Sequence, residues 1–259
     1  MKLQLVVFLL ACKISFGQDW MGEIMVGASA YNGDLTQQAF SFKRVNPAFG
    51  FNIKYNTGDF LNIRAGIAFE KVSANDKDNK SPFLQARNLN FKTNILEFDL
   101  SFEFVLLDPE VYDAYPYLFA GVGLFHFDPY TYDDNGAKTY LHPLSTEGQG
   151  LPDFGRKDYS LIQPCVPVGA GFKYKINKKF EASFEFGYRW LFTDYLDDVS
   201  KTYVSLEILS ARKGPESADL SYRKVGVPFS EEGYPRGNPK VKDYYWFSGV
   251  KLAFKLNKK

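Results

Sequence analysis

Only two histidines, His126 and His142, are available for histidine-based chemistry in this chain of 259 residues. A histidine that takes a proton from a serine, with an acid behind it, can catalyse acyl transfer or hydrolysis. His126 could form such a trio with Asp128 and either Ser145 or Ser160. Nothing in the spacing requires these residues to meet. The favoured interpretation is a histidine among aromatic residues, and we predict no catalytic residues.

Three carboxylates occur close together at Asp194, Asp197 and Asp198. Carboxylate oxygens are the ligands that calcium prefers, but this segment lacks the alternating acids and the glycine of a calcium-binding loop. The glycine-rich segment Glu147–Gly150 does not join a strand to a helix, which argues against a phosphate-binding loop. We therefore predict a hydrogen-bonded or solvated acidic turn, and no metal or other cofactor.

The elements that would position these residues are β-strands. In the segment 180–190, aromatic residues and one alanine occupy every second position, and Glu181, Glu185 and Arg189 fall between them. Successive side chains of a strand project to opposite faces, so this strand has one apolar wall and one charged wall. That pattern is typical of a strand with lipid on one side and a polar lumen on the other.

Similar alternation predicts strands elsewhere along the chain. Together with 180–193, the predicted strands are 21–31, 48–56, 60–72, 89–105, 116–127, 161–176 and 245–256. Short and long connections alternate between them, which is typical of barrels in the bacterial outer membrane. The sequence therefore predicts an all-β fold, an eight-stranded antiparallel transmembrane β-barrel with short periplasmic turns and long extracellular loops.

Two strands carry predicted irregularities. The apolar positions of 89–105 change phase near Ile95, which predicts a β-bulge because one extra residue reverses all later side chains. Pro164 and Pro167 cannot donate to a ladder, so we expect an interruption in 161–176. The neighbouring Cys165 is interpreted as a structural residue. Aromatic girdles at the membrane interfaces are predicted from Trp20, Tyr55, Tyr117, Tyr188, Trp190 and Trp246.

Charged residues on the predicted inner faces have both signs. The central set is Arg64, Glu97, Glu103, Glu185 and Arg189, with Glu70, Asp99, Lys173 and Lys251 beside it. An eight-stranded barrel has room for side chains and little else. Because an unpaired buried charge costs several kcal/mol, we expect a paired network that closes the lumen.

The ends and the overall charge give further expectations. Residues 1–17 are predicted to be a signal peptide, because Lys2 precedes an apolar run and small residues precede Gln18. A lipoprotein signal ending at Cys12 is the alternative. Residues 18–259 form the predicted barrel, located in the outer membrane and in contact with its lipid. The net charge of +1 gives no indication of nucleic-acid binding.

Several stretches resemble a family of small outer-membrane β-barrels from Bacteroidetes that includes PorG-like subunits of the type IX secretion system. These stretches are Arg87–Phe91, Pro116–Phe125, Tyr140–Gly150, Phe184–Arg189 and Thr193–Ser200. The resemblance implies a non-enzymatic barrel that tethers a periplasmic ring. The implied partners are a lipoprotein of the PorK or GldK type and its partner of the PorN or GldN type.

Three functions remain as hypotheses at this level. The first is an anchor for an envelope machine, in which Val111 and Tyr112 of the turn 106–115 contact a periplasmic partner. The second is binding of lipopolysaccharide, a glycan or a protein by the long loop 200–244. Its basic residues are Arg212, Lys213, Arg223, Lys224, Arg236, Lys240 and Lys242. The third is modification of lipid A by the His126 trio.

Overall fold

The computed structural model describes residues 19–36, 42–57, 60–224, 227 and 232–256. The predicted signal peptide 1–17 and the alternative signal ending at Cys12 lie outside these residues. Eight long strands form the main body: β1 (Asp19–Asn32), β2 (Asn46–Asn56), β3 (Leu61–Asn75), β4 (Asn90–Val105), β5 (Ala114–His126), β8 (Ile162–Lys175), β9 (Phe180–Leu191) and β10 (Tyr244–Lys255).

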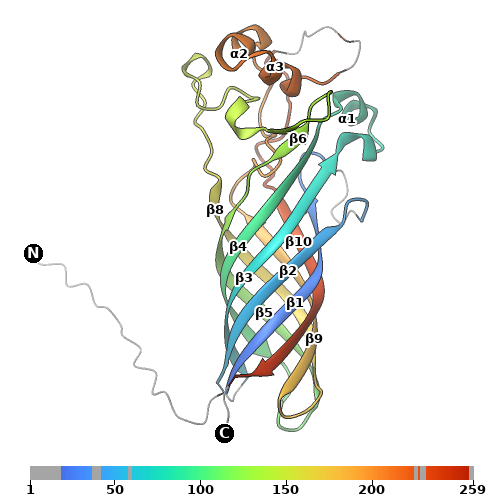
Figure 1. Ribbon diagram of the computed structural model, residues 1–259, viewed down its shortest axis with the longest axis vertical. Helices are drawn as coiled ribbons and strands as arrows, with labels where there is room; N and C mark the ends of the chain where they lie inside the picture. The colour runs from blue at the N-terminus through green and yellow to red at the C-terminus, as the bar shows by residue number, and fades with distance from the viewer. Residues whose placement is uncertain (1–18, 37–41, 58–59, 225–226, 228–231, 257–259) are drawn as a thin grey trace, which may run out of the picture.

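These eight strands close into a ring. Each strand pairs antiparallel with the next, from β1 through β5 and then β8 to β10. The ring closes between β1 and β10, where Ala28 lies opposite Ser248. Figure 1 shows the tilted strands of this barrel, with β1 beginning and β10 ending at the rim opposite the helices. The predicted eight-stranded antiparallel transmembrane barrel is confirmed.

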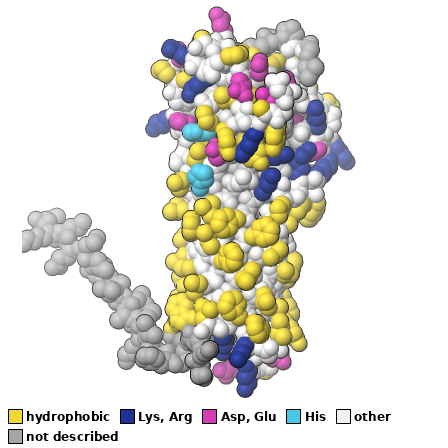
Figure 2. All heavy atoms as spheres, viewed as in Figure 1, with side chains coloured by type: hydrophobic (Ala, Val, Ile, Leu, Met, Phe, Trp, Pro, Cys, Tyr) yellow, Lys and Arg dark blue, Asp and Glu magenta, His cyan; other side chains and the backbone are white. Residues whose placement is uncertain are grey.

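The wall has the predicted two faces. Phe98, Phe102 and Phe104 of β4 project outward and are about half exposed, whereas Ser101 and Glu103 between them are fully buried. Figure 2 shows hydrophobic side chains gathered over the barrel wall between two more polar ends. An apolar belt of this kind is stable only when lipid covers it, so the barrel spans the outer membrane.

The predicted β-bulge near Ile95 is wrong. The ladder between β3 and β4 runs without a shift from Leu61↔Phe104 to Asn75↔Asn90. Phe91 and Ile95 lie on the same inward face as Glu97 and are buried. The phase change in the sequence has another cause. The interior of the barrel turns from polar to apolar above Glu97, while the strand keeps its register.

The interruption expected at the prolines is confirmed. Ala120 pairs with Val168 and Gly123 pairs with Cys165, but the two pairs between them are missing from the ladder of β5 and β8. Pro167 falls in this gap, where it has no N–H to donate. The register is the same on both sides of the gap, so the strand continues in phase. Cys165 is a free, buried thiol, in agreement with a structural role.

The girdle prediction holds for most of its members. Trp20 packs against Tyr55 near one rim, with ring centroids 4.9 Å apart, and Trp190 is exposed near the other. Tyr117 contradicts the prediction, because it projects into the lumen and is fully buried. The cause is β5, whose two faces are both apolar in sequence, so that alternation could not assign its inward side. Trp246 is on the outer face but is buried beneath Phe42.

The long connections fold into a cap over the extracellular end (Figure 1). Its α-helices are α1 (Pro82–Arg87), α2 (Leu206–Lys213) and α3 (Pro215–Ser221). Short 3-10 helices span Asp76–Asp78, His142–Leu144 and Pro152–Phe154. The strands β6 (Tyr130–Tyr132) and β7 (Lys138–Tyr140) form a hairpin. Leu35, Leu196 and Leu220 of the cap join Phe91 and Phe125 of the barrel in one buried apolar cluster. The cap is therefore packed onto the barrel core. Among the described residues, no helix is both long and apolar enough to span a membrane.

Candidate functional site

The predicted lumen network is present and centres on Arg64. Its Nη1 atom lies 2.9 Å from Glu103 Oε1 and 2.7 Å from Glu185 Oε2. Lys173 pairs with Glu103, and Lys251 pairs with Glu185. All five side chains are almost completely buried. Each glutamate thus has two cationic partners, which is the pairing that burial of charge requires.

A second set of contacts lies next to this centre. Arg189 Nε lies 2.9 Å from Glu97 Oε1, and the Tyr245 hydroxyl donates to Glu97 at 2.6 Å. The Cys165 thiol is 3.7 Å from the same carboxylate. Glu70 is also buried, but neither of its carboxylate oxygens has a hydrogen-bond partner among the described residues. Pairing is therefore extensive in the lumen but not complete.

Several other residues of the lumen were missing from the predicted set. Lys54 lies 3.0 Å from Glu23 and 2.7 Å from Glu181, and the hydroxyl of Tyr115 donates to Glu181 at 2.5 Å. Tyr117 donates to Glu185 at 2.7 Å. Strand alternation places Lys54 and Glu181 on inner faces, so their place in the lumen could have been predicted from the sequence. Tyr115 and Tyr117 gave no such signal, because β5 is apolar on both faces.

The ion pairs cross the lumen. Arg64 is on β3 and Glu185 is on β9, which stand on opposite sides of the ring of eight strands. Arg189 of β9 reaches Glu97 of β4 in the same way. In a barrel of this size such contacts fill the interior. The lumen is therefore crossed by side chains, and the accessible surfaces lie at the two ends and on the outer wall.

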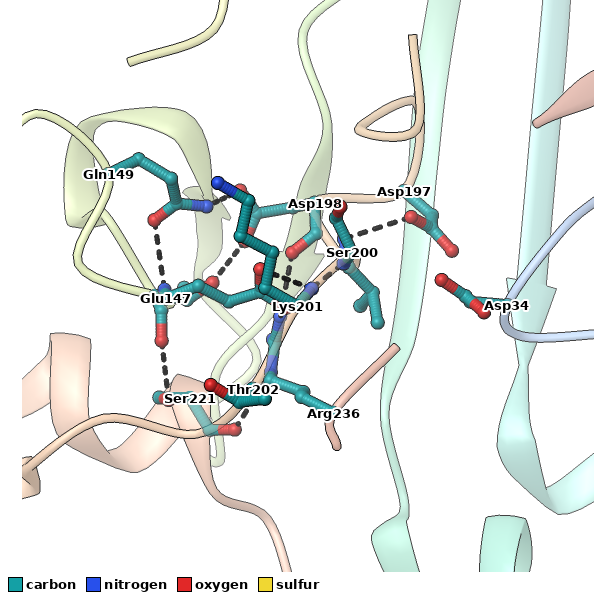
Figure 3. A network of polar contacts seen from close by, with 12 residues as sticks. Asp34, Glu147, Gln149, Asp197, Asp198, Ser200, Lys201, Thr202, Ser221 and Arg236 are labelled. Atoms are coloured by element: carbon teal, nitrogen blue, oxygen red, sulfur yellow. Dashed lines mark hydrogen bonds and ion pairs between the residues drawn. The ribbon is translucent and has the colours of Figure 1, made fainter. Parts of the chain in front are cut away.

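The cap contains a buried ion pair of its own. Arg236 Nη1 lies 3.1 Å from Glu147 Oε1, and both side chains are almost fully buried. The Glu147 carboxylate also accepts from the backbone N–H groups of Ser200 at 3.0 Å and Lys201 at 2.9 Å. Arg236 in turn donates to the Asp198 carbonyl at 2.7 Å. Figure 3 shows how these contacts join the segment around Glu147 to the connection between β9 and β10.

Arg87 forms a second buried centre in the cap. It donates to both carboxylate oxygens of Asp76 at 2.7 Å and to the Asp34 carbonyl at 2.9 Å. Asp76 also accepts from the backbone N–H of Leu89 at 2.9 Å. A further bond runs from Arg87 to the carbonyl of Arg236. Arg87 thus joins the three connections that follow β1, β3 and β9, and Arg236 adds the connection between β5 and β8 through Glu147.

The acidic turn is hydrogen-bonded, as predicted, at two of its three residues. Asp197 accepts from the Tyr31 hydroxyl at 2.5 Å, and Asp198 accepts from the Tyr159 hydroxyl at 2.8 Å. Burial raises the pKa of Asp198 to about 6. Asp194 is also buried, neither of its carboxylate oxygens has a hydrogen-bond partner among the described residues, and burial raises its pKa to about 7. The described part of the chain contains no group of metal-ligating side chains able to hold an ion.

The predicted docking residues lie at the periplasmic rim, in the turn between β4 and β5. The Asp108 carbonyl accepts from the N–H groups of Val111 at 3.2 Å and Tyr112 at 3.0 Å. Lys175 holds the turn from the neighbouring strand by donating to the Pro109 carbonyl. The exposed fractions are 69% for Val111 and 50% for Tyr112. Two apolar side chains thus project from a turn that is fixed by its own backbone.

A comparison with the models of known protein families identifies the family of this chain. The model of a domain of unknown function, DUF6089, matches residues 1–212. The chain belongs to the DUF6089 family. No curated protein matches this DUF6089 chain.

Three solved structures resemble the DUF6089 barrel. The surface protein NspA of Neisseria is 9% identical, with a TM-score of 0.47, and the match covers 93% of this chain and 99% of NspA. A major outer membrane protein of Thermus thermophilus is 11% identical, with a TM-score of 0.44 and coverages of 92% and 99%. The N-terminal β-barrel domain of OprF from Pseudomonas aeruginosa is 10% identical, with a TM-score of 0.40 and coverages of 92% and 98%. The closed ring of strands described above, and not these likenesses, identifies the fold.

In this DUF6089 barrel the hypothetical histidine trio is not joined by hydrogen bonds. His126 is exposed on the outer face at the end of β5. The Ser160 hydroxyl donates to the carbonyl of Ile162 at 2.9 Å, and Ser145 is buried in the cap. No contact among the described residues links either serine to His126 or Asp128. Neither Ser145 nor Ser160 thus has His126 beside it as the base that would activate a serine nucleophile.

The basic residues of the loop 200–244 are mostly engaged within the cap. Arg236 is buried against Glu147, so it is not available to a ligand at the surface, as the loop-binding hypothesis required. Arg212 pairs with Asp153 at 2.9 Å, and Arg223 pairs with Asp134 at 3.2 Å. Lys213 donates to a backbone carbonyl. This loop therefore offers an external anion fewer unpaired charges than its sequence indicates.

Proposed function

We propose that this DUF6089 barrel is a non-enzymatic anchor in the outer membrane that holds a periplasmic partner through the turn between β4 and β5. The observation that carries the proposal is the exposure of Val111 and Tyr112 on a fixed turn at the periplasmic rim. Aromatic side chains such as that of Tyr112 are enriched at the buried centre of protein interfaces. The ion pairs across the lumen support an anchor over a channel.

The resemblance to PorG-like proteins suggests the named form of this role. In that form the barrel tethers a ring made of a PorK- or GldK-type lipoprotein and its PorN- or GldN-type partner, and serves type IX secretion. The acids Asp108, Glu110 and Asp113 surround the apolar pair. A partner with a small apolar patch and a basic rim would complement this turn.

A pull-down with matched variants tests the proposal. The tagged barrel is extracted from membranes as wild type, as Val111→Glu with Tyr112→Glu, and as Tyr234→Glu, which alters an exposed aromatic residue in the cap. Mass spectrometry then identifies the proteins recovered with each. We expect the double variant to lose the periplasmic partner by at least tenfold, because burial of two carboxylates in an interface is strongly unfavourable. The Tyr234 variant should retain it.

The outcomes separate the general role from the named one. Equal recovery of the partner by the double variant would refute docking at this turn, provided that heat-modifiable gel mobility shows an assembled barrel. Recovery of a periplasmic protein other than the ring components would keep the anchor and exclude the PorG-like assignment. A wild-type barrel that brings no periplasmic protein with it would overturn the anchor itself.

A further inference from the structure

A basic and aromatic surface lies on the outside of the barrel where the apolar belt ends. We call it the outer shelf, and its residues are Lys71, Lys92, Tyr130, Tyr132, Lys138 and Tyr140. Phe69 of β3 and Leu96 of β4 are outward residues of the belt and lie opposite each other. Farther along the same faces, Lys71 is opposite Asn94 and Lys92 is opposite Ser73. Figure 2 shows basic side chains above the belt on the side of the molecule that carries β3, β4 and β6.

The hairpin β6–β7 supplies the aromatic part of the shelf. β6 extends the sheet beside β4, with Tyr130 opposite Lys92. The Lys92 ammonium group is 4.8 Å from the centre of the Tyr132 ring. The Lys138 ammonium group lies 4.0 Å from the Tyr130 ring and 4.3 Å from the Tyr140 ring. These contacts hold the two ammonium groups in place, and no acid among the described residues pairs with either of them.

The three lysines of the shelf have no carboxylate partner of their own in the described chain. None of Lys71, Lys92 and Lys138 forms an ion pair in the part of the chain that the structure describes, whereas Arg212 and Arg223 of the cap have carboxylate partners. Tyr130 and Tyr140 of the shelf line the same groove as Phe69 and Leu96 of the belt, so the shelf lies beside the belt. A set of uncompensated cations at that height would meet the headgroups of the outer leaflet.

A groove of about 250 Å³ runs beside the shelf. Phe69 and Leu96 provide apolar lining, and His126, Asp128 and Tyr140 provide polar groups. Asp128 is the acid in this lining. A carboxylate can accept a hydrogen bond from a hydroxyl group of a ligand, whereas a bare phosphate dianion has no hydrogen to donate to it. The groove thus combines a place for an acyl chain, a hydroxyl acceptor and adjacent cations.

We propose that the outer shelf binds the phosphorylated sugar headgroup of an outer-leaflet glycolipid of the lipopolysaccharide class. The phosphate would lie between Lys71, Lys92 and Lys138, and a sugar hydroxyl would donate to Asp128. The first acyl carbons would follow Phe69 and Leu96 down onto the belt. This site is at the opposite end of the barrel from Val111 and Tyr112, so its test is independent of the anchor.

The test uses the full chain in nanodiscs of neutral phosphatidylcholine. Binding of fluorescently labelled bisphosphorylated lipid A is compared for the wild type, for the triple variant Lys71→Gln, Lys92→Gln and Lys138→Gln, and for a control triple variant. The control removes the same charge from exposed positions of the cap by Lys157→Gln, Lys240→Gln and Lys242→Gln. We expect the shelf variant to bind about 100-fold more weakly, since each lysine at an anionic lipid surface contributes roughly fivefold. The control should bind like the wild type.

Three results would overturn the proposal. Equal weakening in the control variant would mean a general field of positive charge. Undiminished binding of lipid A that lacks both phosphates would exclude phosphate recognition. Complete displacement of lipid A by inorganic phosphate at millimolar concentration would indicate a free-phosphate site instead of a lipid site. If the triple variant fails to assemble, Lys92→Gln and Lys138→Gln are measured singly, each with an expected loss of about fivefold.

Discussion

Replacement of Arg236 by methionine should loosen the cap while the barrel stays assembled. The change leaves the Glu147 carboxylate buried without its cationic partner and removes the donors to the Asp198 and Ser221 carbonyls. Removal of one partner of a buried ion pair costs about 3–5 kcal/mol. At about 1.4 kcal/mol for each tenfold change, the population of the open cap should rise by about 100-fold to about 4,000-fold.

Hydrogen exchange measured by mass spectrometry can follow this opening. Backbone amides of α2 and α3 exchange through opening of the cap, whereas those of β9 report on the barrel. We expect protection to fall in the two helices and to remain in β9. The control is Arg212→Met, which removes the pair with Asp153 on the surface of the same cap. Because this pair is fully exposed and screened by solvent, its loss should change protection far less than the loss of Arg236 does.

A second variant examines the cause of the loss. Glu147→Gln combined with Arg236→Met removes both charges, so the double variant should be more protected than Arg236→Met alone. Unchanged protection in Arg236→Met would refute the role assigned to the pair. An equal loss in Arg212→Met would refute the argument that burial determines the magnitude.

Three further predictions concern the lumen and the acidic turn. Arg64→Met should destabilise the barrel by about 3–5 kcal/mol in urea unfolding from vesicles, because two buried glutamates lose a shared partner, whereas Lys178→Met on an exposed turn should not. The wild type should show no steady conductance in planar bilayers, and an open current would contradict a filled lumen. Burial raises the pKa of Asp194 to about 7 and of Asp198 to about 6, so the folded cap holds protons that the unfolded chain releases near pH 4. The stability of the cap should therefore fall as pH rises from about 4 to about 7. Hydrogen exchange of the cap, corrected for the intrinsic pH dependence of amide exchange, measures this fall. In Asp194→Asn the stability should depend less steeply on pH, because one of the two titrating groups is gone.

The barrel was predictable because lipid and lumen impose a period of two on most of its strands. That alternation gave the eight strands with bounds close to those observed, as for 180–193 against Phe180–Leu191. It also placed Arg64, Glu103 and Glu185 together in the lumen. Tyr117 was assigned to a girdle because β5 has apolar residues on both faces, and no period then distinguishes inside from outside.

The cap was not predictable for a different physical reason. Its principal contacts are not local, as between Glu147 and Arg236, which are 89 positions apart. A single arginine in a polar loop carries no periodic signal that separates a buried partner from a solvated charge. Phe91 and Ile95 did carry a signal, but a change of phase has two explanations, an extra residue or a change in what fills the interior. Only the ladder of β3 and β4 distinguishes them.

The change from polar to apolar filling explains why the cap and the barrel form one folded unit. Below Glu97 the interior is satisfied by charges that reach across the lumen, and those charges need no other element. Above it, Phe91 and Ile95 present apolar surface that the strands alone cannot cover, and residues such as Leu35 and Leu220 of the cap cover it. Burial of that surface holds the cap against the barrel without contact with lipid or another protein. The exposed apolar side chains of the turn at Val111 and the cations of the outer shelf then lie where a partner or lipid can reach them.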